Sequence, residues 1–206
     1  MSIRAVVSDF GGVLTAPLLP TFIRAHADLG IPLEALGAVM RRGGQARLHA
    51  LERGELSERD FLAAIQNGLS QELGRPVSLD GYGRRLFDGL DANERLFDYF
   101  RELRRRGLRL AILTNNVREW EPLWRAKLPI DEVFELVVDS AFVGLRKPEP
   151  EIYALTLERL ELPAQACVFL DDLEINVDAA RALGMHGIHF QDTEQAIREL
   201  ESVLAA

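Results

Sequence analysis

Five short stretches of the chain are almost continuously apolar and rich in Val, Ile and Leu. They lie at residues 3–10, 108–114, 135–140, 166–172 and 186–190. A strand buried on both faces of a sheet has this uninterrupted pattern, whereas a strand with one face in water alternates apolar and polar residues. The pattern therefore predicts buried strands in a parallel sheet.

Between and after these stretches, apolar residues recur at the three- and four-residue spacing of an amphipathic helix. Helices are predicted at residues 91–107, 149–161, 173–183 and 193–204. Asp91 and Glu94 resemble a capping box at the start of the first of them, and Gly107 is placed to end it. Because strands and helices alternate, the chain predicts a doubly wound α/β fold.

Residues 16–88 interrupt this alternation. They contain no β-rich stretch and carry helical patterns. Loops are expected at residues 30–32, 42–44 and 74–76. Because the segment lies between the first and second predicted strands, we expect it to be an inserted helical domain. The core domain would then consist of residues 1–15 and 89–206.

Composition narrows the class of protein. With 206 residues, 48% of them hydrophobic, the chain is long enough for one sizeable core and a smaller satellite domain. Its formal net charge of -8 disfavours a nucleic-acid partner, since such proteins usually carry a basic face. The single Cys167 allows no disulfide within the chain and fits a buried small hydrophobe. No apolar run reaches the ~20 residues of a membrane span and no signal peptide is recognisable, so we expect a cytoplasmic protein with no membrane partner.

Polar side chains follow three of the predicted strands at the point where each strand ends. They are Asp9 after the first strand, Thr114, Asn115 and Asn116 after the second, and Asp171 and Asp172 after the fourth. Ligands bind outside the carboxyl ends of the strands in open α/β sheets, so these side chains are expected at one edge. Lys147, one of only two lysines, lies between the third and fourth strands and precedes Pro148, which favours an extended backbone there.

These side chains are of the kind that binds a cation and an anion at one site. The aspartates would repel one another unless a divalent ion joined them, and carboxylate oxygens favour Mg²⁺. Thr114 and Lys147 would then face a phosphate, one as a hydrogen-bond donor and the other as a neutralising charge. A carboxylate nucleophile that forms an aspartyl-phosphate is an established route for phosphoryl transfer. Each residue alone also fits a turn, a helix cap or a surface lysine, so the prediction depends on all the positions together.

The order of the segments DFGGVLT, AILTNN, RKPEPEIY and VFLDD resembles the four motifs of haloacid dehalogenase-like hydrolases. The resemblance covers nearly the whole chain. It implies a Rossmann-like core, and it places residues 16–88 where members with a small helical cap carry that cap. The stretch ERGELSERDF (52–61) is similar to the caps of relatives of the N-terminal phosphatase domain of soluble epoxide hydrolase.

The resemblance also implies roles in binding and catalysis. Asp9 is expected to be the nucleophile. Thr114 and Asn115 are expected to contact the phosphate of the substrate. Lys147 is expected to steady both the nucleophile and the charge on the phosphoryl group.

A Mg²⁺ site is implied in the same way. Asp9 and Asp172 are expected to be metal ligands, and Asp171 is expected to support the metal directly or through water. The residue at position 11 is expected to offer its backbone carbonyl, which a glycine also has.

Gly11 departs from the pattern of the family's phosphatases, which usually have an Asp at this position. That Asp acts as a general acid toward the leaving group and then as a base toward water. Losing such a group costs about 10²–10⁴-fold in rate, and the loss is smallest for substrates with good leaving groups. His49, Glu52 and Glu55 of the inserted segment are candidates to replace it.

Two other functions stay open. One is hydrolysis of a carbon–halogen bond at Asp9, because dehalogenases also lack the second Asp. They usually have an aromatic residue there and lack the acids of the fourth motif, which this chain keeps. The other is a catalytically silent homologue that binds a phosphorylated ligand or a protein. Phosphonate cleavage is disfavoured because it uses a cap lysine, and residues 16–88 contain none.

The leading prediction is therefore a Mg²⁺-dependent phosphohydrolase of a small phosphorylated metabolite, as a monomer or a homodimer. The sequence does not name the substrate. Arg41, Arg42 and Arg47 are candidates to meet a second anionic group, although surface positions explain them equally well. Trp120 is a candidate for a substrate wall, although packing is the simpler role for it and for Trp124.

Overall fold

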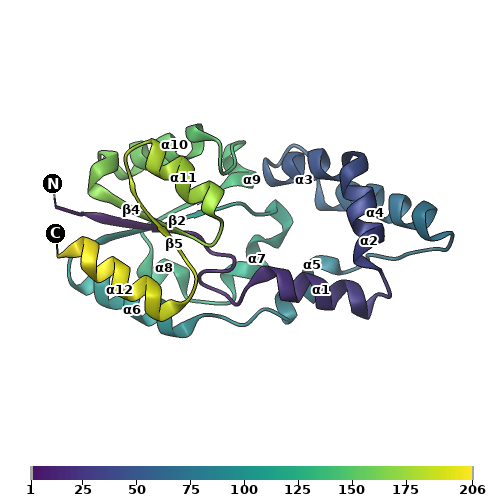
Figure 1. Ribbon diagram of the computed structural model, residues 1–206, viewed down its shortest axis with the longest axis horizontal. Helices are drawn as coiled ribbons and strands as arrows, with labels where there is room; N and C mark the ends of the chain where they lie inside the picture. The colour runs from purple at the N-terminus through teal and green to yellow at the C-terminus, as the bar shows by residue number, and fades with distance from the viewer. Residues whose placement is uncertain (1, 206) are drawn as a thin grey trace.

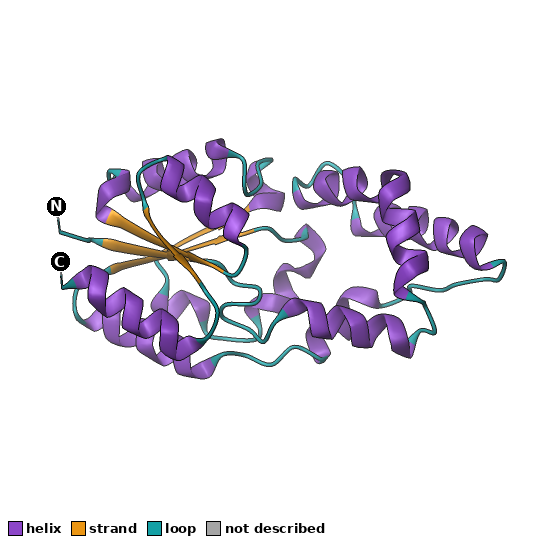
Figure 2. Ribbon diagram, viewed as in Figure 1, coloured by secondary structure: helices purple, strands orange, loops and turns teal. Residues whose placement is uncertain are grey.

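The structure is a computed structural model and describes residues 2–205. Its centre is a five-stranded sheet in the order β3-β2-β1-β4-β5, in which every neighbouring pair is parallel. The strands are β1 (Ala5–Ser8), β2 (Arg109–Thr114), β3 (Leu136–Asp139), β4 (Cys167–Asp171) and β5 (His186–His189). Each lies within a predicted stretch, and Figure 2 shows them as one layer between helices, so the predicted α/β fold is confirmed.

Helices cover both faces of this sheet, as Figure 1 shows. They are α6 (Glu94–Arg105) and α12 (Thr193–Leu204) on one face, and α10 (Pro150–Leu160) and α11 (Glu174–Ala182) on the other. Val6 and Ile112 belong to the apolar cluster of the first face, whereas Val7 and Leu113 belong to that of the second. Because side chains alternate along a strand and both faces are covered, the strands are apolar throughout.

Shorter helices connect these layers. They are η2 (Arg118–Trp120), α7 (Glu121–Arg125), α8 (Ile130–Val133), α9 (Ser140–Val143) and η3 (Ala164–Ala166). Within the described part of the chain, no helix combines the length and the apolar character needed to cross a lipid bilayer.

The helices between β1 and β2 form an insert, drawn on the right of Figure 1, with an apolar cluster that also takes in Val117 from the segment after β2. Its elements are α1 (Leu18–Asp28), α2 (Leu33–Val39), η1 (Met40–Gly44), α3 (Gln45–Glu52), α4 (Glu58–Leu73) and α5 (Tyr82–Asp88). Gly30 and Gly74 have positive φ angles of 63° each and lie in turns that end helices, as expected. At Arg42 and Gly43 the backbone leaves helical geometry for two residues, which separates α2 from α3.

The predicted capping box at Asp91 was wrong. Helix α6 begins at Glu94, and its cap is Asn93, whose side chain accepts a hydrogen bond from the backbone N–H of Leu96 at 3.2 Å. The residues before Asn93 are held in extended backbone instead, because Ala92 forms an isolated bridge with Thr15. This pairing ties the end of the insert to the loop that follows β1.

Asp139 is a buried acid at the end of β3, where its side chain accepts a hydrogen bond from the N–H of Ala141 at 3.0 Å and caps α9. Burial raises the pKa of this carboxyl from 3.8 to about 6. Because the pKa is higher in the folded than in the unfolded protein, part of the stability is lost as the pH rises from 3.8 to about 6. We therefore expect the stability difference between Asp139→Asn and the wild type to move by about 1 kcal/mol in favour of the variant between pH 5 and pH 8. Chemical denaturation at both pH values measures this, and an unchanged difference would contradict a titrating carboxyl here.

Candidate active site

The carboxyl ends of three neighbouring strands bring the predicted side chains together. Asp9 follows β1, which lies between β2, ending at Thr114, and β4, ending at Asp171. The backbone N–H of Asp9 donates to the carbonyl of Leu170 at 2.8 Å, which fixes Asp9 at the strand end. All three side chains are buried, with Asp171 at 0% exposure. The strand ends thus hold these three side chains in a largely buried site.

Lys147 lies at the centre of this site. Its Nζ is 2.8 Å from Oδ1 of Asp9 and 2.6 Å from Oδ2 of Asp171, and its side chain is 2% exposed. The side chain of Asn115 donates to the carbonyl of Lys147 at 2.9 Å and accepts from its N–H at 2.8 Å. Both ends of the side-chain amide of Asn115 therefore hold the loop that carries Lys147, and its expected contact with a phosphate stays a prediction.

Three carboxylates surround the lysine. One oxygen from each of Asp9, Asp171 and Asp172 lies within 4.8 Å of the other two. The second oxygen of Asp171, Oδ1, accepts from the N–H of Leu173 at 2.8 Å and from Nδ2 of Asn176 at 3.0 Å. Within residues 2–205, the side chain of Asp172 accepts no hydrogen bond from another residue, so its oxygens are the more open to a ligand.

Crowding of negative charge in this buried place shifts the ionisation of its members. Burial, with Asp171 and Asp172 adding to it, raises the pKa of Asp9 to about 7, against the attraction of Lys147. Burial and the charge of Asp171 raise the pKa of Asp172 to about 6. Burial would lower the pKa of Lys147, but the carboxylates of Asp171 and Asp9 outweigh it and the pKa is raised. The single positive charge of Lys147 therefore does not balance the three carboxylates around it.

The backbone beside Asp172 is shaped for a close approach. Gly12 has a φ of 80°, which favours glycine, and a Cβ added there would lie 2.3 Å from Oδ2 of Asp172. Glycine therefore lets this carboxylate lie against the loop that follows Asp9. Carboxylate and backbone carbonyl oxygens are the ligands that hard divalent cations such as Mg²⁺ accept. The residues present fit such an ion, which would supply the missing positive charge.

The position of the absent carboxylate, at Gly11, is covered by an apolar side chain. A Cβ added to Gly11 would lie 2.9 Å from Cδ1 of Leu18, the first residue of α1. Phe10, on the other side, is buried and packs on Trp124 with ring centroids 4.9 Å apart. Packing is thus the role of Trp124, as expected, and no acid takes the place that position 11 leaves.

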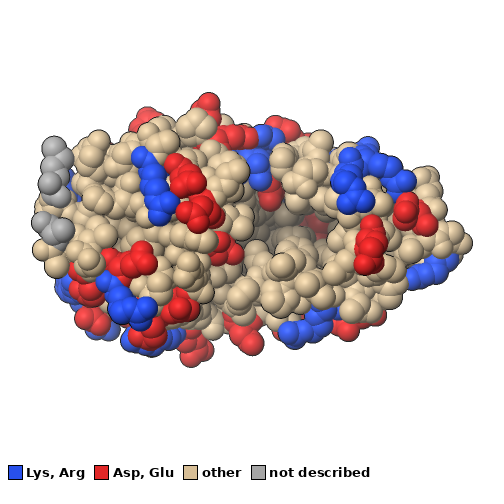
Figure 3. All heavy atoms as spheres, viewed as in Figure 1, with Lys and Arg blue, Asp and Glu red and all other residues tan. Residues whose placement is uncertain are grey.

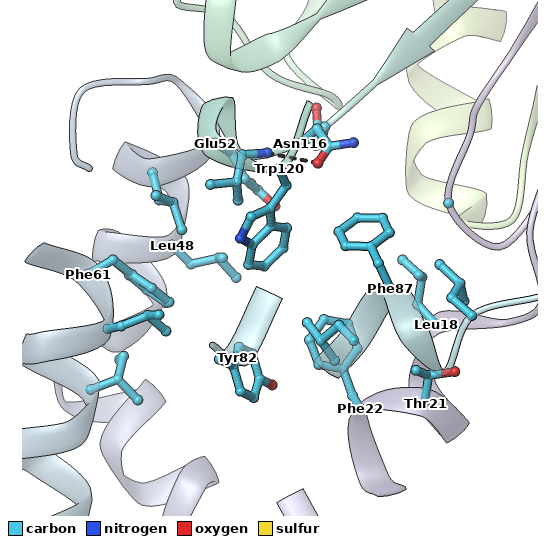
Figure 4. A pocket seen from close by; sticks show the side chains of 18 of the residues that line it. Leu18, Thr21, Phe22, Leu48, Glu52, Phe61, Tyr82, Phe87, Asn116 and Trp120 are labelled. Atoms are coloured by element: carbon cyan, nitrogen blue, oxygen red, sulfur yellow. Dashed lines mark hydrogen bonds between the residues drawn. The ribbon is translucent and has the colours of Figure 1, made fainter. Parts of the chain in front are cut away.

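A cavity of about 330 Å³ extends from Gly11 and Thr114 into the helical insert. Its walls are mainly aliphatic and aromatic, and Figure 4 shows Phe22, Phe61 and Tyr82 around its interior. Trp120, the candidate substrate wall, lines it as well. Figure 3 shows the opening as a hollow between the two lobes, bordered largely by uncharged atoms. This apolar lining was not predicted from the sequence, because its residues are spread over the insert and form no motif.

Most charged candidates from the insert lie outside the cavity. Of the three candidates to replace the acid only Glu52 lines it, and its carboxylate is engaged in an ion pair, 2.7 Å from Nε of Arg146. None of the three candidate arginines lines the cavity. Arg42 pairs with Glu72, and Arg47 donates to the carbonyl of Gly43 at 3.3 Å, in keeping with surface roles.

Residues 52–58, which we call the docking segment, fasten the insert to the core. The contacts are Glu52 with Arg146, Arg53 with Glu149, Gly54 with Ala141, and Glu58 with Trp120. Two of the core partners flank Lys147 in sequence, so the segment presses on the loop that positions the lysine. The closest approach is at Gly54, which has a φ of 69° and where a Cβ would lie 2.2 Å from the carbonyl oxygen of Ala141.

Replacing Gly54 by alanine should separate the insert from the core. The added methyl group cannot fit against Ala141, so the docking segment must move and the cavity wall with it. We expect kcat/KM to fall by about 10- to 100-fold, since displacements of about 1 Å near a site have such effects. Gly74→Ala is the matched control, because Gly74 has a φ of 63° but no atom within 4 Å of its would-be Cβ. Steady-state kinetics of the two variants measures this effect. An equal loss of activity in Gly54→Ala and Gly74→Ala would contradict the docking role.

Comparison with known proteins adds to this geometry. Residues 3–184 match the model of the haloacid dehalogenase-like hydrolase family. Bifunctional epoxide hydrolase 2 of Sus scrofa is 30% identical over 98% of this chain, which spans only 39% of that protein's length. Phosphatase MT3486 of Mycobacterium tuberculosis is 31% identical over 98% of this chain and 96% of its own.

A similar fold occurs among solved structures. The HAD family enzyme bt-2542 of Bacteroides thetaiotaomicron superposes with a TM-score of 0.74 over 93% of this chain and 95% of its own, at 22% identity. The same enzyme has been solved in complex with magnesium and inorganic phosphate, with a TM-score of 0.62. At this identity the likeness establishes the fold.

Proposed function

The chain belongs to the haloacid dehalogenase-like hydrolases, and we propose that it is a Mg²⁺-dependent phosphohydrolase that forms an aspartyl-phosphate at Asp9. The observation that carries the proposal is the buried cluster in which Lys147 joins Asp9 and Asp171 beside Asp172. The nearly full-length similarity to phosphatase MT3486, and the magnesium and phosphate held by the structural relative, support the same chemistry.

In the first step an oxygen of Asp9 attacks the phosphorus atom. A bond forms from this oxygen to phosphorus, and the bond from phosphorus to the ester oxygen breaks, with the electron pair leaving on that oxygen. Lys147 favours the ionised, nucleophilic form of Asp9, because the pKa of Asp9 would otherwise rise further with burial. The hydroxyl of Thr114, at the end of β2, would donate a hydrogen bond to a phosphoryl oxygen.

In the second step water attacks the phosphorus of the aspartyl-phosphate. The bond from phosphorus to the oxygen of Asp9 breaks, inorganic phosphate leaves with the protons of the water, and Asp9 returns as a carboxylate beside Lys147. Asp9, Asp172 and the backbone carbonyl of Gly11 would hold the ion, with Asp171 fixing the lysine. When bound, Mg²⁺ supplies positive charge to the phosphoryl oxygens.

The two parts of the chain have separate tasks in this proposal. Residues 1–15 and 89–206 form the hydrolase core, and residues 16–88 act as a cap. The apolar cluster of the insert and the contacts of the docking segment support this division. The cap would exclude water from the aspartyl-phosphate and select the substrate.

Hydrolysis of 4-nitrophenyl phosphate tests the proposal. We expect turnover by the wild type with Mg²⁺ and its loss when the ion is removed by a chelator. Asp9→Asn should lower the rate by about 10⁶-fold, the effect known for removal of a nucleophile. Because nitrophenolate leaves readily, Gly11 should not limit this reaction. A folded wild-type protein that gives no turnover with Mg²⁺ would overturn the proposal.

Hydrolysis of a 2-haloacid at Asp9 is the second candidate, favoured by Gly11, since a departing halide needs no proton. Labelled water separates the two. Attack of water on phosphorus places ¹⁸O in phosphate, whereas hydrolysis of an alkyl-ester intermediate at its carboxyl carbon places ¹⁸O in Asp9. Mass spectrometry of the peptide that contains Asp9, after turnover of each substrate class, decides between them.

A further inference from the structure

The cavity next to the cluster has walls that suit an apolar body. No lysine or arginine lines it among residues 2–205, so a substrate with a second phosphate or a carboxylate would find no fixed counter-charge there. The hydroxyl groups of a sugar would lose their water without enough new partners, and each unpaired buried polar group costs free energy. Phe61, Leu62 and Ile65 of α4, with Leu48 of α3, offer only apolar contacts.

Four of the polar side chains along the wall are engaged by the protein itself. Among residues 2–205, the hydroxyl groups of Thr21 and Thr114 and Nδ2 of Asn116 have no such partner. The indole N–H of Trp120 donates to Glu58 of the docking segment at 2.7 Å, and Glu52 is paired with the core. Nδ1 of His26 lies 2.7 Å from the carbonyl oxygen of Phe22, so it carries the proton and donates, which leaves Nε2 to accept from the hydroxyl of Tyr82 at 3.4 Å. The cavity therefore presents few unsatisfied partners to a polar ligand.

At the end of the cavity beside Asp9, the loop that follows β1 contributes apolar groups, whereas the residues that end β2 are polar. Gly11, Phe10 and Leu18 line it, and Cδ1 of Leu18 is in contact distance of the place where a side chain at position 11 would begin. An oxygen that leaves phosphorus here meets no carboxylic acid to protonate it. Only an oxygen that is stable as an anion leaves readily under these conditions.

The size of the cavity limits the length of the substrate. Its volume of about 330 Å³ corresponds to roughly eleven water-sized groups at about 30 Å³ each. A methylene or an aromatic CH is of similar size, so a body of about ten carbon atoms fills the space.

Building on the proposed phosphohydrolase activity, we propose that the substrate is a phosphate derivative of an apolar phenol or carboxylic acid. It is an aryl or acyl phosphate with a body of about ten carbon atoms. The phosphorus accepts Asp9, the bond from phosphorus to the leaving oxygen breaks, and the electron pair departs on a phenolate or a carboxylate without a proton. Water then releases phosphate from Asp9, as above. The apolar body lies against α3, α4 and Trp120.

A series of 4-alkylphenyl phosphates tests the apolar part, because the leaving oxygen has nearly constant basicity while the chain grows. Burial of each methylene should raise kcat/KM by about fourfold, and the rise should stop near butyl or pentyl, when the cavity is full. Leu62→Trp should move this limit to shorter chains. Leu73→Trp, on the same helix but outside the cavity, is the control. Equal kcat/KM along the series would overturn this part.

The leaving-group part has its own test. With about ten carbon atoms in each body, decanoyl phosphate and 4-butylphenyl phosphate should both react far faster than decyl phosphate, and the faster of the two identifies the acyl or the aryl class. Gly11→Asp combined with Leu18→Ala, which makes room, should raise the rate on decyl phosphate by about 10²–10⁴-fold. Leu18→Ala alone should not. Decyl phosphate reacting as fast as the other two in the wild type would overturn the proposal.

These outcomes separate the substrate class from the activity. A protein that hydrolyses 4-nitrophenyl phosphate but is indifferent to chain length and leaving group is still a phosphohydrolase, with the substrate inference wrong. A protein inactive on every ester and on 4-nitrophenyl phosphate contradicts the proposed function itself.

Discussion

Replacing Lys147 by methionine is expected to abolish activity and to destabilise the protein by about 3–5 kcal/mol in the absence of Mg²⁺. The lysine is almost fully buried, at 2.8 Å from Asp9 and 2.6 Å from Asp171. Methionine keeps the volume of the side chain but leaves these carboxylates without a counter-charge. Turnover should fall by at least about 10²–10³-fold, because a positive charge that meets the phosphoryl group is also lost.

The other lysine of the chain provides the control. Lys127 lies in the turn that follows α7, is partly exposed and forms no ion pair among the described residues, so Lys127→Met should change neither property appreciably. Denaturant unfolding and steady-state kinetics measure the two effects. Mg²⁺ should restore part of the stability of Lys147→Met, because the ion brings positive charge to the same carboxylates. A Lys147→Met protein as stable and as active as Lys127→Met would contradict the described cluster.

Asp172→Asn is expected to remove the response of the protein to Mg²⁺. An ion that binds only the folded state raises the free energy of unfolding by about 2.7 kcal/mol at a concentration 100 times its Kd. The wild type should show such a rise in thermal stability with Mg²⁺, whereas the variant should show little. Its turnover should fall in parallel, since the ion assists phosphoryl transfer.

An exposed acid on the helix that follows serves for comparison. Asp178 of α11 pairs with Arg181 at 3.0 Å on the surface, so Asp178→Asn should keep the full response to Mg²⁺. Without Mg²⁺, Asp172→Asn should be at least as stable as the wild type, because burial and repulsion disfavour the carboxylate that it removes. If Mg²⁺ raised the stability of Asp172→Asn as much as that of the wild type, the ion would bind elsewhere.

The sequence predicted the parts of the site that depend on strand ends. Apolar runs that stop at Asp9, Thr114 and Asp171 mark the edge where parallel strands finish, and the sheet order then places them side by side. Lys147 was identifiable because it precedes a proline between two strands and is one of two lysines. These signals are local in sequence, so a pattern of residues was enough to find them.

Features that depend on contacts between distant segments were not predictable in this way. Nothing in the neighbourhood of Asn115 indicated that its side-chain amide would bind the backbone of Lys147, 32 residues away. The need for glycine at position 12 arises from the carboxylate of Asp172 in another strand's loop. The helix predicted from Asp91 begins later because of a bridge between Thr15 and Ala92.

The cavity is the largest feature that the sequence did not reveal. Its lining comes from several helices of the insert and from the core, and each of these residues also fits an ordinary apolar core position. Trp120 was the single wall residue that the sequence suggested, from its closeness to Thr114. The cavity arises because the docking segment fastens the insert to the core and leaves space between them.

The most direct test of the account is to trap the phosphorylated enzyme. The wild type, mixed with Mg²⁺ and 4-nitrophenyl phosphate and quenched in acid during turnover, is digested and its peptides are weighed. We predict one added phosphoryl group on Asp9, which disappears when the substrate is exhausted and is absent from Asp9→Asn. Full turnover with no phosphoryl group on Asp9, or with one on another residue, would contradict Asp9 as the nucleophile.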